Sequence, residues 1–124
     1  MTAIKEPLID RWRAIQERHW TLSCALEREL QEQHGIGLSE FEALERLVEG
    51  GKDSYRAQEL TDVLPLSQSA ASRVVARLEK RGMVSRGMCE MDRRGISICL
   101  TDAGRQCYDE ARPTHRAVLD NLLA

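Results

Sequence analysis

The stretch LSQSAASRVVARLEKRGMV, residues 66–84, together with MDRRGISICLTDAG, residues 91–104, decides the fold of this chain. In the first stretch, apolar residues recur at steps of three and four, which is the period of an amphipathic helix. The residues of this apolar stripe are Ala71, Val74, Val75 and Leu78. Pro65 ends the helix before it, and Gly82 is well placed to end this one. We therefore predict two helices separated by a short turn, the second beginning at Ser67.

After Gly82 the apolar pattern changes from a helical to an alternating period, which is typical of strands. The residues that indicate two short strands are Met83, Val84 and Arg86, and then Ile96, Ile98 and Leu100. Residues 92–95, Asp-Arg-Arg-Gly, lie between the strands and predict a charged hairpin tip. The order helix, turn, helix and hairpin is that of a winged helix-turn-helix. The predicted fold class is mainly α with a small β-hairpin wing and flanking dimerisation helices.

Amphipathic helices are also predicted on the amino-terminal side of this motif. Residues 8–33 carry a long apolar stripe, formed by Leu8, Trp12, Ile15, His19, Leu22, Leu26 and Leu30. Its apolar area exceeds what a small domain covers by itself, so we expect part of this helix to pack against a second subunit. Ser39 and Glu42 predict a capping box at the start of a short helix that the glycine pair at 50–51 ends.

Two further helices complete the expected pattern. The first runs over about 56–64, and its predicted inward residues are Ala57, Leu60, Val63 and Leu64. The second begins near residue 102, where Thr101 and Asp102 provide a cap. Because proline lacks a backbone N–H, we expect Pro113 to kink or restart this last helix.

Charge is distributed unevenly along the chain. The formal net charge is −2, yet residues 67–94 carry seven basic and three acidic groups, and the remainder carries 11 basic and 17 acidic groups. One basic segment on an acidic body is expected when a single face of a protein meets phosphate. A solvated charged surface explains the same distribution equally well, so charge alone does not assign a function.

The exposed side of the helix that starts at Ser67 has a composition suited to reading DNA. A major groove about 12 Å wide admits one helix. The small residues that let its backbone approach the base edges are Ser69, Ala70 and Ser72. Arg73 can then form paired hydrogen bonds with a guanine or a phosphate. An arginine at the hairpin tip can enter a narrow minor groove, and we expect Asp92 to orient Arg94 for this contact.

Residues 66–84 and 91–104 together resemble the MarR family of bacterial regulators. The most specific element is the wing signature Asp-x-Arg, here Asp92 and Arg94, which leads into a strand ending in Leu-Thr-x-x-Gly. The similarity covers about 38–104 and includes the run LSEFEALERL.

The resemblance implies a single MarR-like domain, 1–124, with dimerisation helices at 8–34 and 102–124 and a winged helix-turn-helix core at 38–101. It implies a transcriptional regulator, a repressor in preference to an activator, that binds a pseudo-palindromic operator in double-stranded DNA as a homodimer. Release by a small-molecule effector is favoured over release by oxidation. The residues expected to contact DNA are Ser67, Gln68, Ser69, Ser72, Arg73, Arg77, Arg86, Arg93 and Arg94. A further helix usually completes the dimer interface in this family, and the resemblance would place it after Ala124.

Several aromatic, thiol and imidazole groups have both a functional and a plain interpretation. Trp12 and Trp20 are the candidate effector-pocket residues, because an aromatic ligand would suit them, although interface packing explains them as well. Cys24 lies on a largely apolar helix and is expected to be a packed thiol. A disulfide between Cys89 and Cys99 is less favoured than two free thiols. His115 is expected in solvent or at the dimer interface.

Other classes of function find little support in the sequence. It contains no phosphate-binding glycine loop, no paired catalytic carboxylates and no cysteine beside a well-placed base, so we expect no enzyme. No residue pattern predicts a metal or another cofactor. A winged helix used only for protein contacts is the second alternative, but the basic segment argues against it. With no signal peptide and no apolar run of roughly 20 residues, we expect a cytoplasmic protein without a membrane partner.

Overall fold

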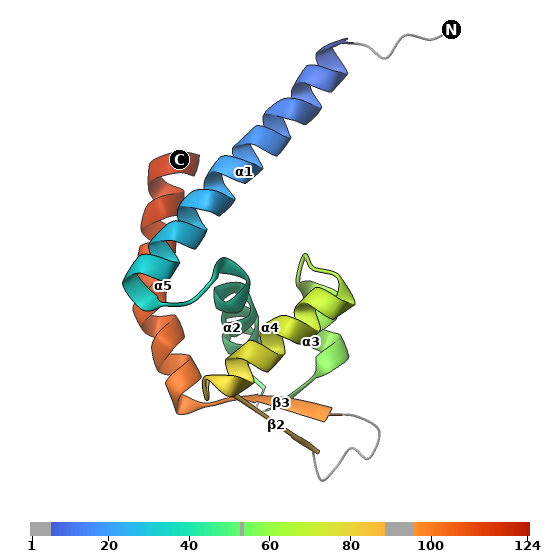
Figure 1. The fold of residues 1–124 in the computed structure, drawn as a ribbon, viewed down its shortest axis with the longest axis vertical. Coiled ribbons are helices and arrows are strands. Elements are labelled where there is room, and N and C mark those ends of the chain that lie inside the picture. Colours follow the sequence, from blue (N-terminus) through green and yellow to red (C-terminus); the bar gives the residue numbers. More distant parts are fainter. Residues whose placement is uncertain (1–5, 53, 89–95) are drawn as a thin grey trace, which may run out of the picture.

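The computed structural model describes residues 6–52, 54–88 and 96–124. The elements in chain order are α1 (Glu6–His34), α2 (Leu38–Gly50), β1 (Tyr55–Arg56), α3 (Ala57–Val63), α4 (Gln68–Lys80), β2 (Val84–Met88), β3 (Ile96–Leu100) and α5 (Asp102–Leu123). Figure 1 shows α5 beside the second half of α1, whereas the first half of α1 extends away from the remaining elements. The predicted fold class, mainly α with a small antiparallel wing sheet, is confirmed.

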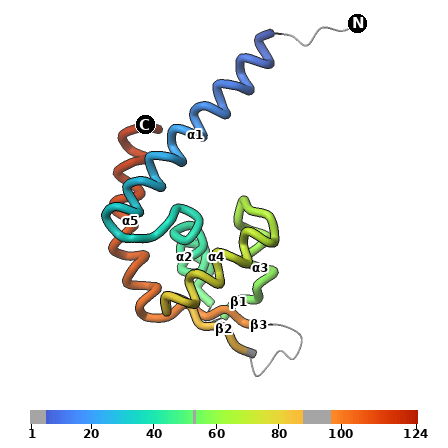
Figure 2. Tube along the Cα trace, viewed as in Figure 1, coloured from blue at the N-terminus to red at the C-terminus, as the bar shows by residue number. Residues whose placement is uncertain are grey.

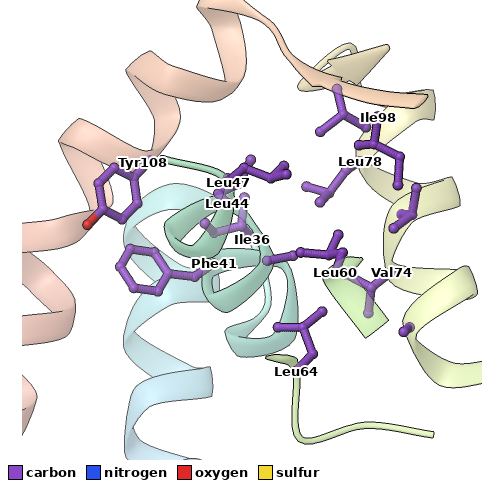
Figure 3. Packing of buried hydrophobic residues seen from close by; sticks show 14 of the residues in the cluster. Ile36, Phe41, Leu44, Leu47, Leu60, Leu64, Val74, Leu78, Ile98 and Tyr108 are labelled. Carbon is purple, nitrogen blue, oxygen red and sulfur yellow. The ribbon is translucent and has the colours of Figure 1, made fainter. Parts of the chain in front are cut away.

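The hydrophobic core surrounds α2, the helix that contacts both the long helices and the winged helix-turn-helix. Figure 3 shows core side chains of α3, α4, β3 and α5 converging on those of α2. The labelled core residues are Ile36, Phe41, Leu44, Leu47, Leu60, Leu64, Val74, Leu78, Ile98 and Tyr108. Because Tyr108 belongs to α5 and Ile98 to β3, the same core joins the carboxyl-terminal helix to the wing.

The long helix α1 buries only its carboxyl-terminal end in this chain. Of its predicted apolar stripe, Leu26 and Leu30 are buried, whereas every residue over 11–20 is exposed. Cys24 is exposed as well, so the prediction of a packed thiol is wrong for the single chain. It fails because Cys24 lies about 160° around the helix axis from Leu26, on a side of α1 that the core does not cover. Packing of the first half against a second subunit stays a prediction.

The start of α2 differs from the predicted cap. The helix begins at Leu38 with Gly37 as its N-cap, so Ser39 lies inside the first turn and its capping role was wrongly predicted. The backbone N–H of Gly37 donates to Oε1 of Glu40 at 3.2 Å. The carboxylate of the capping box therefore belongs to Glu40 and not to the predicted Glu42. The chain reaches this cap through Gly35, whose φ of 69° is in the left-handed region that favours glycine.

The helix-turn-helix matches the sequence pattern except at two positions of α3. Leu60 and Leu64 are buried, but Ala57 and Val63 are exposed, so their predicted inward positions are wrong. Ala57 is the first residue of a seven-residue helix, and Val63 lies about 100° around the helix axis from Leu64. In α4 the predicted stripe is confirmed, since Ala71, Val74, Val75 and Leu78 are all buried.

The wing belongs to a three-stranded antiparallel sheet in the order β1-β3-β2. The two predicted strands are confirmed, and Val84 pairs with Leu100 while Arg86 pairs with Ile98. The sequence did not predict β1, because two residues are too few to establish an alternating period. In Figure 2, β1 lies beside β3, where Tyr55 pairs with Ile98.

The amino-terminal end of α5 is joined closely to the end of α4. The hydroxyl of Thr101, the N-cap, accepts from Gly104 N at 3.1 Å and donates to the Gly82 carbonyl at 2.6 Å. A Cβ on Gly104 would lie 2.1 Å from the Met83 carbonyl oxygen, so only glycine fits where the first turn of α5 meets the turn before β2. This contact gives a steric reason for the glycine of the wing signature.

The carboxyl-terminal half of α5 corrects two predictions. The helix continues through Pro113, so of the two expected outcomes, a kink or a restart, the restart does not occur. His115 is buried, with 8% of its surface exposed, rather than solvated. It turns inward because its imidazole stacks on Phe41, with ring centroids 4.5 Å apart.

Candidate nucleic-acid interface

The exposed face of α4 carries the residues that were predicted to contact DNA. Ser67 caps the helix, and its Oγ accepts from Ala70 N at 3.2 Å. The predicted contacts in this segment are all exposed: Ser67, Gln68, Ser69, Ser72, Arg73 and Arg77. The buried stripe of α4 fixes the opposite side against the core, so this polar face is held outward as a unit.

Arginines along α4 and β2 differ in how they are held. Arg73 forms no ion pair with any residue in the described parts of the chain. Arg77 Nε lies 3.9 Å from Glu40 Oε1, and Arg86 Nε lies 3.7 Å from Glu79 Oε1. These two arginines are therefore positioned by carboxylates, whereas Arg73 is available to a guanine or a phosphate.

Several predicted wing residues belong to the segment 89–95, which the structure does not describe. Asp92, Arg93 and Arg94 lie outside the described residues, as does Cys89 of the suggested disulfide. The strands that lead to them are described, and Cys99 is a free thiol opposite Ser85 in the sheet. The wing contacts therefore stay predictions.

One functional feature of this surface was not predicted from the sequence. Glu40 is buried and binds Arg81, whose Nη1 donates to Oε2 at 3.2 Å. The signal was present, because Glu40 lies in the predicted capping segment and Arg81 in the basic segment. Their separation of 41 residues in sequence concealed the pairing.

A second candidate site is a cleft of about 570 Å³ between α1, the start of α2 and the turn before α4. Residues that line it include Trp20, Cys24, Leu38, Ser39, Glu42 and Leu66. Of the two predicted effector-pocket residues, Trp20 lines this cleft and Trp12 does not. Burial raises the pKa of the Glu42 carboxyl, and the nearby charge of Glu45 raises it further.

The far side of α2 holds a second polar cluster, which joins it to α5. The Glu45 carboxylate accepts from the Tyr108 hydroxyl at 2.9 Å and binds the Arg116 guanidinium. Burial by itself would raise the pKa of Glu45, but these hydrogen bonds and the charge of Arg116 hold it below its usual value. The cluster therefore fixes α5 against the helix-turn-helix core with a stable ion pair.

No cluster of three or more potential metal ligands occurs among residues 6–52, 54–88 and 96–124. In the same parts of the chain, none of the helices is both long enough and apolar enough to cross a bilayer.

Comparison with curated proteins identifies the family. The MarR family model matches residues 34–95. The transcriptional repressor MprA of Escherichia coli is 33% identical over 88 residues, which make up 71% of this chain and 50% of MprA. The chain thus spans about half the length of this curated relative.

Solved structures extend the similarity to the whole fold. AbsC, a MarR family transcriptional regulator from Streptomyces coelicolor, has a TM-score of 0.89 at 28% identity, over 99% of this chain and 82% of AbsC. Sco3205, a MarR family regulator from the same organism solved in complex with DNA, has a TM-score of 0.90 at 29% identity, over 99% of this chain and 77% of Sco3205. The chain therefore belongs to the MarR family, whose members are winged-helix transcriptional regulators and not enzymes.

Proposed function

We propose that this protein is a sequence-specific DNA-binding repressor whose homodimer reads a pseudo-palindromic operator. The observation that carries the proposal is the exposed polar face of α4, where small serines lie near Arg73, which forms no ion pair with the residues that the structure describes. Such a face lets a helix backbone approach base edges while the arginine reads guanine or binds phosphate. The DNA complex of Sco3205 and the repressor role of MprA support the proposal.

The proposal divides the single domain, 1–124, between two tasks. Residues 38–101 form the DNA-binding core, and the helices over 8–34 and 102–124 form the dimer interface. Exposed apolar side chains on the outer half of α1 support this division, because Leu8, Trp12, Ile15 and Trp20 are each more than half exposed in one chain. The proposed location is the cytoplasm, because a DNA-binding regulator acts where the DNA lies.

Release from DNA would follow from binding of an aromatic small molecule in the cleft beside Trp20. This cleft is bounded by Pro65 and Leu66, which directly precede the cap of α4, so an occupant would contact both α1 and the turn that positions the recognition helix. Cys24 lines the same cleft and is exposed, which supports oxidation as the alternative route.

The first experiment selects duplexes from a random library with the wild-type protein and compares the selected duplex with a random one across a salt titration. We expect a preference of at least about 10³ for the selected duplex. Arg73→Ala and Arg94→Ala should each lower the affinity, and a lost phosphate contact should reduce the salt slope by about one. Arg112→Ala, an exposed arginine on α5, is the matched control and should bind like wild type. Selection of no sequence by the wild type would refute the proposal.

The two tryptophans offer a direct test of the effector cleft, because the chain contains no others. Trp12→Phe leaves Trp20 as the only indole, and Trp20→Phe leaves Trp12. Titration with aromatic carboxylic acids should quench the fluorescence of Trp12→Phe and leave Trp20→Phe unchanged. Equal quenching of both variants would contradict a cleft that contacts Trp20 alone. Repeating the titration with Cys24→Ser after peroxide treatment tests the oxidation alternative.

A further inference from the structure

A buried carboxylate connects the recognition helix to the start of α2. Glu40 is 6% exposed, and its Oε1 accepts from Gly37 N at 3.2 Å. Oε2 accepts from Nη1 of Arg81 at 3.2 Å, and Arg77 Nε lies 3.9 Å from Oε1. One side chain thus contacts the N-cap of α2 and two arginines at the carboxyl-terminal end of α4.

The segment that Glu40 contacts is in turn fixed to α1. The backbone N–H of Leu38 donates to Oε1 of Glu27 at 3.1 Å, and Gly35 N donates to the Gln31 carbonyl at 3.0 Å. Ile36, between the two glycines, is fully buried in the core. The junction between α1 and α2 is therefore held on both sides, by Glu27 from α1 and by Glu40 toward α4.

We propose that Glu40 is a positioning residue that sets the direction of α4 relative to α1. The proposal rests on the proposed function. In a dimer held by α1 and α5, this direction decides how far apart the two recognition helices lie. Half-sites are read about one DNA turn, roughly 34 Å, apart, so a small rotation at the α4 end displaces the base contacts of both subunits. Glu40 would in this way determine operator spacing without touching DNA.

A role in positioning agrees with the energetics of buried ion pairs. Burying the Glu40 carboxylate costs desolvation energy that its attraction to the partly exposed Arg81 only partly returns, so the pair adds little net stability. What it does provide is geometry, because the planar guanidinium of Arg81 accepts few orientations of its partner. Since Arg77 shares the same carboxylate, Glu40 also restricts a predicted DNA contact.

The test measures binding of the selected duplex, of a random duplex and of selected duplexes whose half-site separation is changed by one base pair. Glu40→Gln and Arg81→Gln each remove the charged pair, and the double variant completes a mutant cycle. Glu49→Gln is the matched control, because it removes the same charge from the same helix, where Glu49 pairs with Arg46 at the surface. Thermal unfolding gives a temperature at which every variant is folded. If Glu40→Gln does not fold, Arg81→Gln carries the test, since its side chain is 37% exposed.

Positioning and plain electrostatics predict opposite signs. Removing a negative charge near DNA should by itself strengthen binding to both duplexes. If Glu40 positions α4, Glu40→Gln weakens binding to the selected duplex by about tenfold or more, the cost of one or more mismatched base pairs. Binding to random DNA is then kept, and the dependence on half-site spacing flattens. Arg81→Gln removes a positive charge and should lower binding to both duplexes, but it should also reduce the preference for the selected duplex and flatten the spacing dependence. The double variant should lose no more of that preference than either single variant.

The outcomes separate the two proposals. If the wild type prefers its selected duplex and both variants keep that preference and its spacing dependence, the positioning role of Glu40 is refuted and the proposed function stands. A rise in affinity for both duplexes also refutes positioning. If the wild type selects no sequence, both proposals fail together.

Discussion

At the scale of single residues, the surroundings of His115 favour its neutral form. Its ring stacks on Phe41, and Nδ1 lies 2.8 Å from Nη1 of Arg116. Because a guanidinium only donates, Nδ1 must accept and stay unprotonated. Burial lowers the pKa of His115, and the charge of Arg116 lowers it further, while Glu45 acts in the opposite direction. The imidazole is therefore neutral where it joins α5 to α2.

Stability should depend on pH through this histidine. Below the ordinary histidine pKa of 6.5, the unfolded chain binds a proton that the folded chain does not. The free energy of unfolding should thus be highest above pH 6.5 and fall toward the lowered pKa, by at most about 1.4 kcal/mol per pH unit. His115→Phe keeps the stacking and removes the titration, so the difference between wild type and variant, measured by urea unfolding from pH 7.5 to 5, should shrink as the pH falls. A constant difference would contradict this assignment.

Single residues differed from the sequence-based expectation where the partner of a side chain belongs to another helix. The stripe of α4 could be predicted because Val74 and Leu78 follow a helical period that needs no partner to be recognised. Glu40 and His115 could not be predicted, because a glutamate in a capping segment and a histidine after a proline are usually exposed. Only the fold brings Arg81 and Phe41 to them.

At the scale of elements, α4 depends on its cap as well as on its buried stripe. Ser67 satisfies the backbone donor of Ala70, and its position at the exposed start of the helix is also where DNA contact is proposed. An N-cap serine contributes about 1 kcal/mol to a helix. The geometry therefore shows a capping role for Ser67, and the exposure of this residue is consistent with the proposed DNA contact.

Two substitutions at Ser67 separate these roles. Ser67→Ala removes the cap and should lower the free energy of unfolding by about 1 kcal/mol, which corresponds to a decrease in Tm of a few degrees. Ser67→Asp keeps a capping oxygen and should restore the stability, yet its charge should weaken binding to the selected duplex at low salt. Differential scanning calorimetry and a binding titration measure the two effects. Tight DNA binding by Ser67→Asp would place Ser67 away from the phosphates.

Helices and strands were predicted correctly where enough residues repeat the helical or alternating apolar pattern. The alternation of Ile96, Ile98 and Leu100 predicted β3, and the structure pairs it with β2 as expected. Two-residue β1 carries no period, and the start of α2 was misplaced because Ser39 looks like a cap while the actual cap, Gly37, has no side chain to signal it. The steric requirement at Gly104 likewise becomes visible only when Met83 is placed beside it.

At the scale of the whole molecule, the main question is what covers the outer half of α1. Its long apolar stripe was recognisable from the sequence, and so was the excess of apolar area over what one chain buries. The structure leaves Trp12 57% and Ile15 62% exposed, while Leu122 and Leu123 at the end of α5 are 42% and 49% exposed. Burial of apolar surface is the main driving force for association, so these residues favour a second copy of the chain as the partner.

The dimer can be tested with two double variants of α1. Trp12→Ser with Ile15→Ser removes apolar area from the exposed stripe, whereas Arg13→Ser with Glu17→Ser changes another face of the same turns and leaves the net charge unaltered. Sedimentation equilibrium should give the wild type and the second variant twice the chain mass of 14.1 kDa, and the first variant a single chain mass. Only the first variant should lose the concentration dependence of Tm that dimers show, and with it the preference for two half-sites over one. A monomeric wild type, or a first variant that dimerises as well as the second, would require a different partner for this helix.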